Sequence, residues 1–323
     1  MSEVERGYAL YRAEILSPVK MIPPKLKQGM TANEAFIEIA TSCIVHLQSN
    51  QNGLLQGQDP EYLHQMRIAL RRLRAAQHLF FGKLLQTASS NIVDDLKWLA
   101  KQLGHARDWD VFMTKTLPLL MTKFPEENGF TVLQRQALRC QQHYNKIACV
   151  AIHSRRYAKL LASIGAWLVQ NDHLASRSDM NQQELAPLDK LARRTLCKLD
   201  NNLRKRVQHL KKLSIDELHA VRISTKKLRY ATEFFVELYP RKRSQHYLNS
   251  LIKLQDMMGD INDAATTKCL LKSLLTPKST IAYRRLIEMT ITWINSCEKQ
   301  LLVNIKPKWN RFLSQKLFWK KEK

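Results

Sequence analysis

The sequence predicts an all-α protein built from two tandem four-helix bundles, for three reasons. Glycine (9) and proline (10) are scarce among 323 residues, whereas Leu, Ala, Lys, Gln and Arg, which favour helices, are abundant. Apolar residues recur at helical spacing, and no stretch alternates with the two-residue period of a half-buried strand. A polar, aperiodic segment at 171–186 divides the chain, and each side has room for about four helices joined by short loops.

The predicted organisation has five parts. Prolines and a glycine interrupt "SPVKMIPPKLKQG", so the N-terminal segment reads as irregular, although a short hairpin within it stays open. Hydrophobic residues make up 45% of the chain, which is enough to build a core, so the chain is not a disordered one. The parts are an N-terminal extension (1–28), a first bundle (29–170), a linker (171–186), a second bundle (187–305) and a basic C-terminal tail (306–323).

Capping signals mark where the helices begin. Thr31 and Glu34 form a capping box ahead of "AFIEIATSCIVHLQ", and "SIDE" from Ser214 offers another in the second half. The segment "NQNGLLQGQ" predicts a loop, after which Asp59 caps a helix that has proline at its first position. Further helices are expected at about 91–103, 107–122, 131–150 and 155–170.

Two segments of the chain repeat at a constant offset. Residues 64–108 align with residues 219–263 without a gap, 155 positions apart, and 12 of the 45 pairs are identical. The identical pairs include His64 with His219 and Arg67 with Arg222. A constant offset across a loop predicts internal duplication, with the two halves related by a pseudo-two-fold axis.

The chain is strongly basic, with 52 Lys and Arg against 28 Asp and Glu and a formal net charge of +24. Such a charge destabilises the compact state by self-repulsion unless an anionic partner relieves it. The six cysteines are scattered and show no metal-ligand spacing, so we interpret them as reduced thiols of a cytoplasmic protein. The N-terminus lacks a secretory signal, and the longest apolar run, 160–169, is too short to span a membrane.

Each repeat carries a basic stripe along one helix. At 100° per residue, Arg67, Arg71 and Arg74 fall within an arc of about 80° beside His64, and Leu70 faces the opposite way, toward the core. Like charges three and four residues apart repel, so an anion that bridges them explains the repetition better than solvated side chains do. Arginine suits phosphate because its planar guanidinium donates two parallel hydrogen bonds. The expected anion-binding residues are His64, Arg67, Arg71, Arg72, Arg74, His219, Arg222, Lys226, Lys227 and Arg229.

A second repeated element follows each stripe, in "LGHARDWD" and "MGDIND". Gly104 and Gly259 suggest a helix end or a close backbone approach. Asp108 and Asp263 either cap the next helix or hold stripe arginines by ion pairing, and we expect a structural role for them. We expect the two stripes to lie in a basic central cleft. Further cations either line this cleft or are solvated: Arg107, Arg139, Lys146, Arg194, Lys198 and Lys205.

The strings "LHQMRIALRRLRAAQHLF", "LGHARDWD", "LHAVRISTKKLRYATEFF" and "LQDMMGDIND" resemble the CHAD family, the conserved histidine α-helical domain, over about residues 29–305. The resemblance implies two helical bundles around a basic central cavity that binds inorganic polyphosphate, with association to polyphosphate granules. It implies no catalytic activity and no cofactor. Polyphosphate chain length, the oligomeric state and protein partners stay open.

Three alternatives compete with polyphosphate binding. Nucleic-acid binding is compatible with the charge, but the stripes lack the aromatic platforms on which single-stranded bases stack. An enzyme or an accessory domain of phosphoanhydride metabolism is suggested by "EVER" at Glu3, which partly resembles the ExExK signature of CYTH triphosphatases, but helices and prolines follow it rather than strands. Metal binding through the histidines is the weakest alternative, because no second ligand shares their face.

Overall fold

The structure is a computed structural model that describes residues 17–57, 59–80, 90–174, 187–208 and 215–320. These residues fold into helices, and the β contact recorded within the described ranges is an isolated bridge between Thr31 and Pro187. The prediction of an all-α fold is confirmed. Two predictions lie outside the described residues, namely the part of the linker after residue 174 and the Ser214 cap. The hairpin left open within the first 28 residues is absent from residues 17–28, which are the part of that segment that the structure describes.

The first half of the chain packs five long helices together. The capping box at Thr31 is confirmed, because its side chain accepts from the Glu34 backbone N–H and Glu34 in turn accepts from the Thr31 N–H at 2.7 Å. Asp59 accepts from the Glu61 N–H at 2.7 Å at the start of the stripe helix, as predicted. The elements are α2 (Ala32–Ser49), α3 (Gln51–Gln56), α4 (Pro60–Phe80), α6 (Ser90–Val111), a π-helical turn (Phe112–Thr116), α7 (Leu117–Lys123), α8 (Phe130–His153) and α9 (Arg155–Leu174).

The second half contains α10 (Leu188–Gln208), α11 (Ile215–Phe235), a 3₁₀ turn (Val236–Leu238), α12 (Arg241–Ser273) and α13 (Ile281–Leu313). The two stripe helices, α4 and α11, each have 21 residues, and both of their bounds differ by the predicted offset of 155. This correspondence agrees with duplication, which itself stays a prediction. The boundaries predicted at residues 170 and 305 fall inside α9 and α13.

Two local predictions are wrong. The expected loop at 50–58 contains the short helix α3, because Leu54 is buried and Gly53 lies against the Tyr62 ring, where an added Cβ would approach within 2.2 Å. The expected break between residues 103 and 107 is absent, and α6 continues through Gly104. A glycine inside a helix costs about 1 kcal/mol relative to alanine, and here it gives a neighbouring side chain room to approach the backbone.

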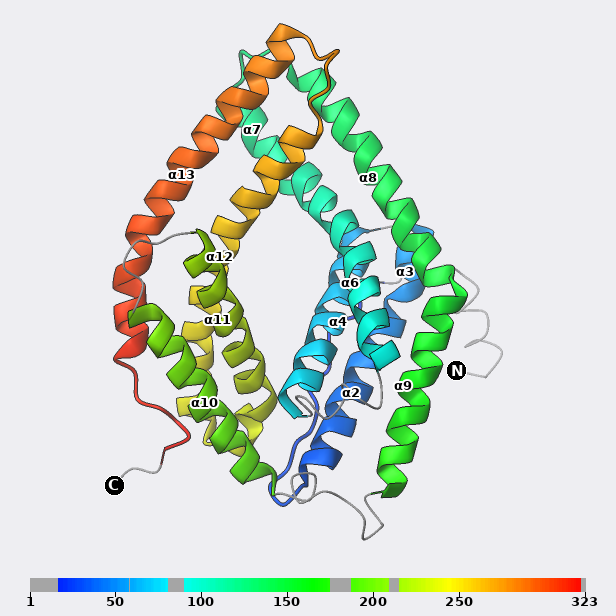
Figure 1. Cartoon of the computed structure of the whole chain (residues 1–323), viewed down its shortest axis with the longest axis vertical. Coiled ribbons are helices and arrows are strands. Elements are labelled where there is room, and N and C mark those ends of the chain that lie inside the picture. Colours follow the sequence, from blue (N-terminus) through cyan, green and yellow to red (C-terminus); the bar gives the residue numbers. More distant parts are fainter. Residues whose placement is uncertain (1–16, 58, 81–89, 175–186, 209–214, 321–323) are drawn as a thin grey trace, which may run out of the picture.

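The two halves meet at two places and lie apart between them (Figure 1). At the lower contact, the C-terminal ends of α4 and α11 pack together, with the Phe80 and Phe235 ring centroids 5.8 Å apart, within a core that both halves share. At the upper contact, α6–α8 meet α12 and α13 in a second core. There the Tyr283 hydroxyl donates to Gln136 at 2.8 Å. The stripes begin between these two contacts.

Candidate functional site

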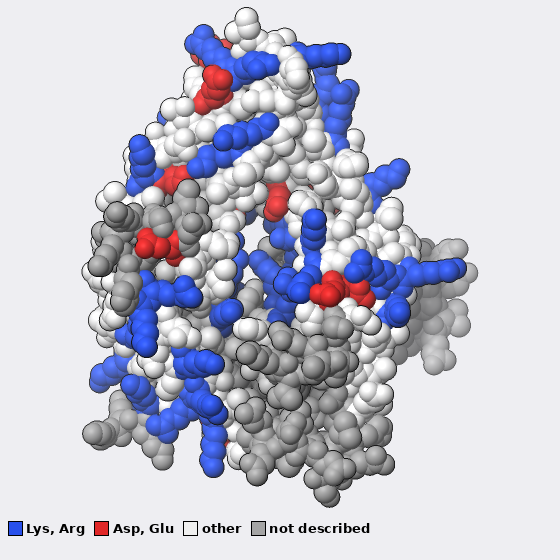
Figure 2. Space-filling model, in the orientation of Figure 1, with Lys and Arg blue, Asp and Glu red and all other residues white. Residues whose placement is uncertain are grey.

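The two basic stripes lie close to one another across the boundary between the halves. Lys226 of α11 interacts electrostatically with Arg71 and Arg67 of α4, and Arg222 of α11 interacts with Arg71. Figure 2 shows a hollow in the middle of the molecule with Lys and Arg side chains at its edge. The residues that converge here, called the central cluster below, are His64, Arg67, Arg71, Arg107, Arg222 and Lys226.

Burial and mutual repulsion disfavour the charged forms of these groups. Burial, together with Arg222, Arg71 and Arg67, lowers the pKa of Lys226 to about 8, although Asp263 opposes the shift. Burial and the neighbouring arginines lower the pKa of Arg67 to about 10, against the opposing effect of Asp108. Desolvation and like charge both act against the protonated form of a cation. The cluster therefore holds repelling charges that an anion would relieve.

His64 lies among three arginines. Its pKa falls to about 4 through burial and the positive charges of Arg107, Arg71 and Arg67, although Glu61 raises it. The imidazole is therefore neutral at pH 7 and can donate one hydrogen bond without adding charge. Arg107 reaches the cluster from α6, as the sequence allowed. His219, the repeat partner of His64, is exposed.

Two carboxylates and one glycine support the cluster. Asp108 and Asp263 lie inside α6 and α12, so the alternative in which they cap the next helix is wrong. Asp108 interacts with Arg67, and the two acids also interact with each other. A Cβ added at Gly104 would lie 3.1 Å from Arg67 Nη1, so this is the close approach that the sequence suggested. Gly259 has open space around its Cβ position and lies inside α12, so neither predicted role applies to it.

Two predicted binding residues contact Glu233 instead of facing other cations. Arg72 Nη1 donates to Glu233 Oε2 at 2.5 Å, and Arg229 Nε donates to Glu233 Oε1 at 2.6 Å. The three side chains are 12–23% exposed, so this triad is largely desolvated. The Arg72 guanidinium also lies 5.2 Å from the centre of the Phe234 ring. The triad joins α4 to α11 beside the lower contact between the halves.

The remaining predicted cations lie at other positions on α4, α8, α10 and α11. Lys227 and Lys198 both lower the pKa of His78, after burial, so these three groups lie together near the end of α4. Arg139 and Lys146 are exposed on α8, and Arg194 and Lys205 are exposed on α10. Arg74 is exposed on α4.

Two guanidinium nitrogens in the cluster are buried without a recorded acceptor. The Nε atoms of Arg71 and Arg222 have no hydrogen-bond partner within the described part of the chain. A buried N–H without an acceptor costs about 1–3 kcal/mol, and more when the group is charged. One arginine comes from each half, so an anion between the halves can accept from both.

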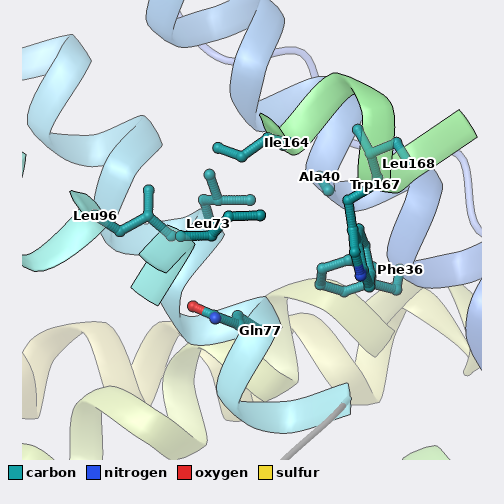
Figure 3. A pocket seen from close by; sticks show the side chains of 9 residues that line it. Phe36, Ala40, Leu73, Gln77, Leu96, Ile164, Trp167 and Leu168 are labelled. Atoms are coloured by element: carbon teal, nitrogen blue, oxygen red, sulfur yellow. The ribbon is translucent and has the colours of Figure 1, made fainter. Parts of the chain in front are cut away.

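An apolar pocket elsewhere in the first half is too small for a ligand (Figure 3). Its volume is about 30 Å³, which is the share of liquid volume of one water molecule. Apart from Gln77, its lining is apolar, and the Phe36 and Trp167 rings meet edge to face at 5.1 Å. The lining residues are Phe36, Ala40, Leu73, Gln77, Ile92, Leu96, Ile164, Trp167 and Leu168.

The described residues contain neither a metal-binding cluster nor a membrane-spanning helix. No group of three or more His, Cys, Asp or Glu side chains in these ranges could hold a metal ion. Over the same ranges, no helix is long and apolar enough to cross a membrane.

The chain is similar to known proteins both in sequence and in fold. The model of the CHAD domain matches residues 38–272, which is most of the chain. The chain belongs to the CHAD-domain family. The crystal structure of the CHAD domain from the plant Ricinus communis is similar over 93% of this chain and 98% of that one, with a TM-score of 0.81 and 28% sequence identity. PptA from Streptomyces chartreusis shares the fold over 87% of this chain and all of its own, with a TM-score of 0.66 and 14% identity. No curated protein sequence matches this one.

Sequence reasoning did not single out Glu233, which neutralises two of the predicted binding residues. One signal was available, because Glu233 follows Arg229 by four residues, which is one helical turn. Its contact with Arg72 depends on how α4 crosses α11, and the sequence alone does not give that geometry.

Proposed function

We propose that this CHAD-domain protein binds inorganic polyphosphate in the central hollow and catalyses no reaction on it. The family is linked to polyphosphate and phosphoanhydride metabolism. The observation that carries the proposal is the central cluster, in which cations from α4, α6 and α11 face one another with buried N–H groups that lack acceptors. Consecutive phosphates would supply acceptors and negative charge at the same place.

The chemistry of the cluster favours a phosphate polymer over single-stranded nucleic acid. Five of the six residues are cations and the sixth is the neutral imidazole of His64, so they can contact phosphate oxygens from several directions. Single-stranded bases stack best on the rings of Phe, Tyr and Trp, and none of the six side chains is one of these. A polyphosphate chain has no bases and needs only donors at regular spacing.

The binding test replaces Arg67, Arg71, Arg222 and Lys226 with glutamine in one protein. A matched control removes four exposed cations, Arg139, Lys146, Arg194 and Lys205, and so has the same net charge. We expect the cluster variant to bind long-chain polyphosphate about a hundredfold or more weakly at 0.15 M salt, because several charge-assisted hydrogen bonds are lost. The control should lose only a few-fold. Equal losses, with native circular dichroism in both, would show that net charge rather than the cluster determines affinity.

Selectivity needs a separate competition. Labelled polyphosphate bound to the wild-type protein is challenged with DNA and RNA at equal phosphate concentration. We expect neither to displace it phosphate for phosphate. Displacement at parity would make the protein a general polyanion binder. A cytoplasmic location with association to polyphosphate granules would follow from the proposed function, and microscopy of a tagged protein in cells with and without polyphosphate tests it.

A further inference from the structure

A second basic cavity lies on the outer side of the second half. It has a volume of about 840 Å³, within the range of small-molecule sites. One wall comes from the first turns of α12 and the other from the segment that follows α13. Figure 1 places the end of α13 at the outer edge of the molecule, away from the gap between α11 and α4. The cavity is therefore separate from the central cluster.

The rim of this cavity is cationic. Five basic residues line it, and no Asp or Glu is among the described residues of its lining. The side chains reach it from two segments about 70 residues apart in the chain. The basic residues are Lys242, Arg243, His246, Lys316 and Lys320, all exposed.

The floor of the cavity is aromatic, and its one hydroxyl group already has a hydrogen-bond partner within the protein. Tyr247 is 1% exposed and its hydroxyl donates to Asp200 Oδ1 at 2.8 Å, so this hydroxyl is not available to a ligand. Phe318 is 8% exposed and meets the Tyr247 ring at 5.5 Å. A ligand would therefore be held by charge at the rim, with apolar contact below it.

The wall after α13 is fixed in place. The Trp319 indole N–H donates to Cys197 Sγ at 3.2 Å, and its ring meets Tyr247 edge to face at 5.1 Å. Gln315 donates to the Ser250 hydroxyl at 2.7 Å. A site whose walls are ordered before binding loses less entropy when a ligand arrives. This segment also lies beyond residue 272, where the match to the CHAD-domain model ends.

We propose that this cavity is a second anion site that binds a compact ligand carrying several phosphate groups. Lysine ammonium groups bind phosphate as mobile point charges, and several of them around one space favour a multiply charged ligand over a single phosphate. The site is independent of the central cluster. An inorganic oligophosphate and a nucleoside triphosphate both carry the required phosphates. The apolar floor would favour the nucleoside triphosphate, because its base can contact that floor.

The first test is lysine acylation footprinting of the wild-type protein, read by mass spectrometry, with inorganic tripolyphosphate and with ATP. We expect at least threefold protection of Lys242, Lys316 and Lys320, and none of the exposed Lys278 and Lys299. Similar protection by both probes identifies an oligophosphate site, and stronger protection by ATP identifies nucleoside phosphates as the source. Failure of both probes to protect the three lysines overturns the proposal.

The second test separates this site from the central one. The starting protein carries Arg71→Gln, Arg222→Gln and Lys226→Gln, so that binding at the central cluster is weakened. Adding Lys242→Gln, Lys316→Gln and Lys320→Gln should reduce the remaining tripolyphosphate affinity at least tenfold. The matched control adds Lys272→Gln, Lys278→Gln and Lys299→Gln, which are also exposed. Equal affinity of the two proteins overturns the second site and leaves the proposal for the central cluster unaffected.

Discussion

Replacing Lys226 with methionine should stabilise the protein and weaken its binding of polyphosphate. Methionine keeps the length of the side chain and removes the charge. Burial and three neighbouring arginines lower the Lys226 pKa from 10.5 to about 8. At 1.36 kcal/mol per pKa unit, this drop corresponds to about 3 kcal/mol of destabilisation by the protonated lysine at pH 7. The side chain is only half-buried, so solvent screening reduces the expected gain to about 1–2 kcal/mol.

The pH dependence gives the stability effect a specific signature. Below pH 8 the lysine is charged in both the folded and the unfolded chain, so the full cost is present in the wild-type protein. Between pH 8 and 10.5 the folded chain loses this proton before the unfolded chain does, so the wild-type protein gains relative stability. The advantage of Lys226→Met should therefore shrink over that window.

Urea unfolding at pH 7 and pH 9.5, without polyphosphate or phosphate buffer, measures this difference. Lys253→Met is the control, because Lys253 is exposed on α12 and its replacement should change the free energy of unfolding by less than about 0.5 kcal/mol. If Lys226→Met leaves the free energy of unfolding unchanged or lowers it at both pH values, the electrostatic description of the cluster is wrong. If polyphosphate affinity is also unchanged, Lys226 does not contact the ligand.

Three further predictions test other parts of the structure. Polyphosphate affinity of the wild-type protein should fall as pH rises above 8, where Lys226 loses its charge, and an affinity constant from pH 6 to 10 would contradict this. Glu233→Gln should lower the free energy of unfolding by about 2–4 kcal/mol, because two desolvated arginines lose their carboxylate, with affinity per folded molecule retained. Gly104→Val should weaken polyphosphate binding about fivefold by displacing Arg67, whereas Gly259→Val, at a site open around its Cβ position, should not alter binding.

Much of the fold was accessible from the sequence because helical signals are local. The capping box at Thr31 and the cap at Asp59 depend on residues within one turn, and both formed as predicted. The break expected at Gly104 failed because that glycine serves a contact with α4, which is distant in the chain. In the sequence, a glycine that ends a helix looks the same as a glycine that leaves room for a side chain from another helix.

The candidate site was predicted less completely than the fold. Helical periodicity placed Arg67 and Arg71 on one face, because that depends only on 3.6 residues per turn. Periodicity also set Arg72 about 100° away from Arg71, but it could not show that Arg71 would face Lys226 or that Arg72 would pair with Glu233. The cavity beside α12 had no sequence signal, because its cations come from two segments that only the packed chain brings together.

The sequence by itself determined the helical class, the family resemblance, the two basic stripes and the excess of positive charge, because these follow from composition and short-range spacing. The tertiary structure decided which cations face one another, which are neutralised and which remain exposed. Coulomb interactions and desolvation depend on distances between side chains, and helices from opposite halves acquire those distances only when α4 packs against α11.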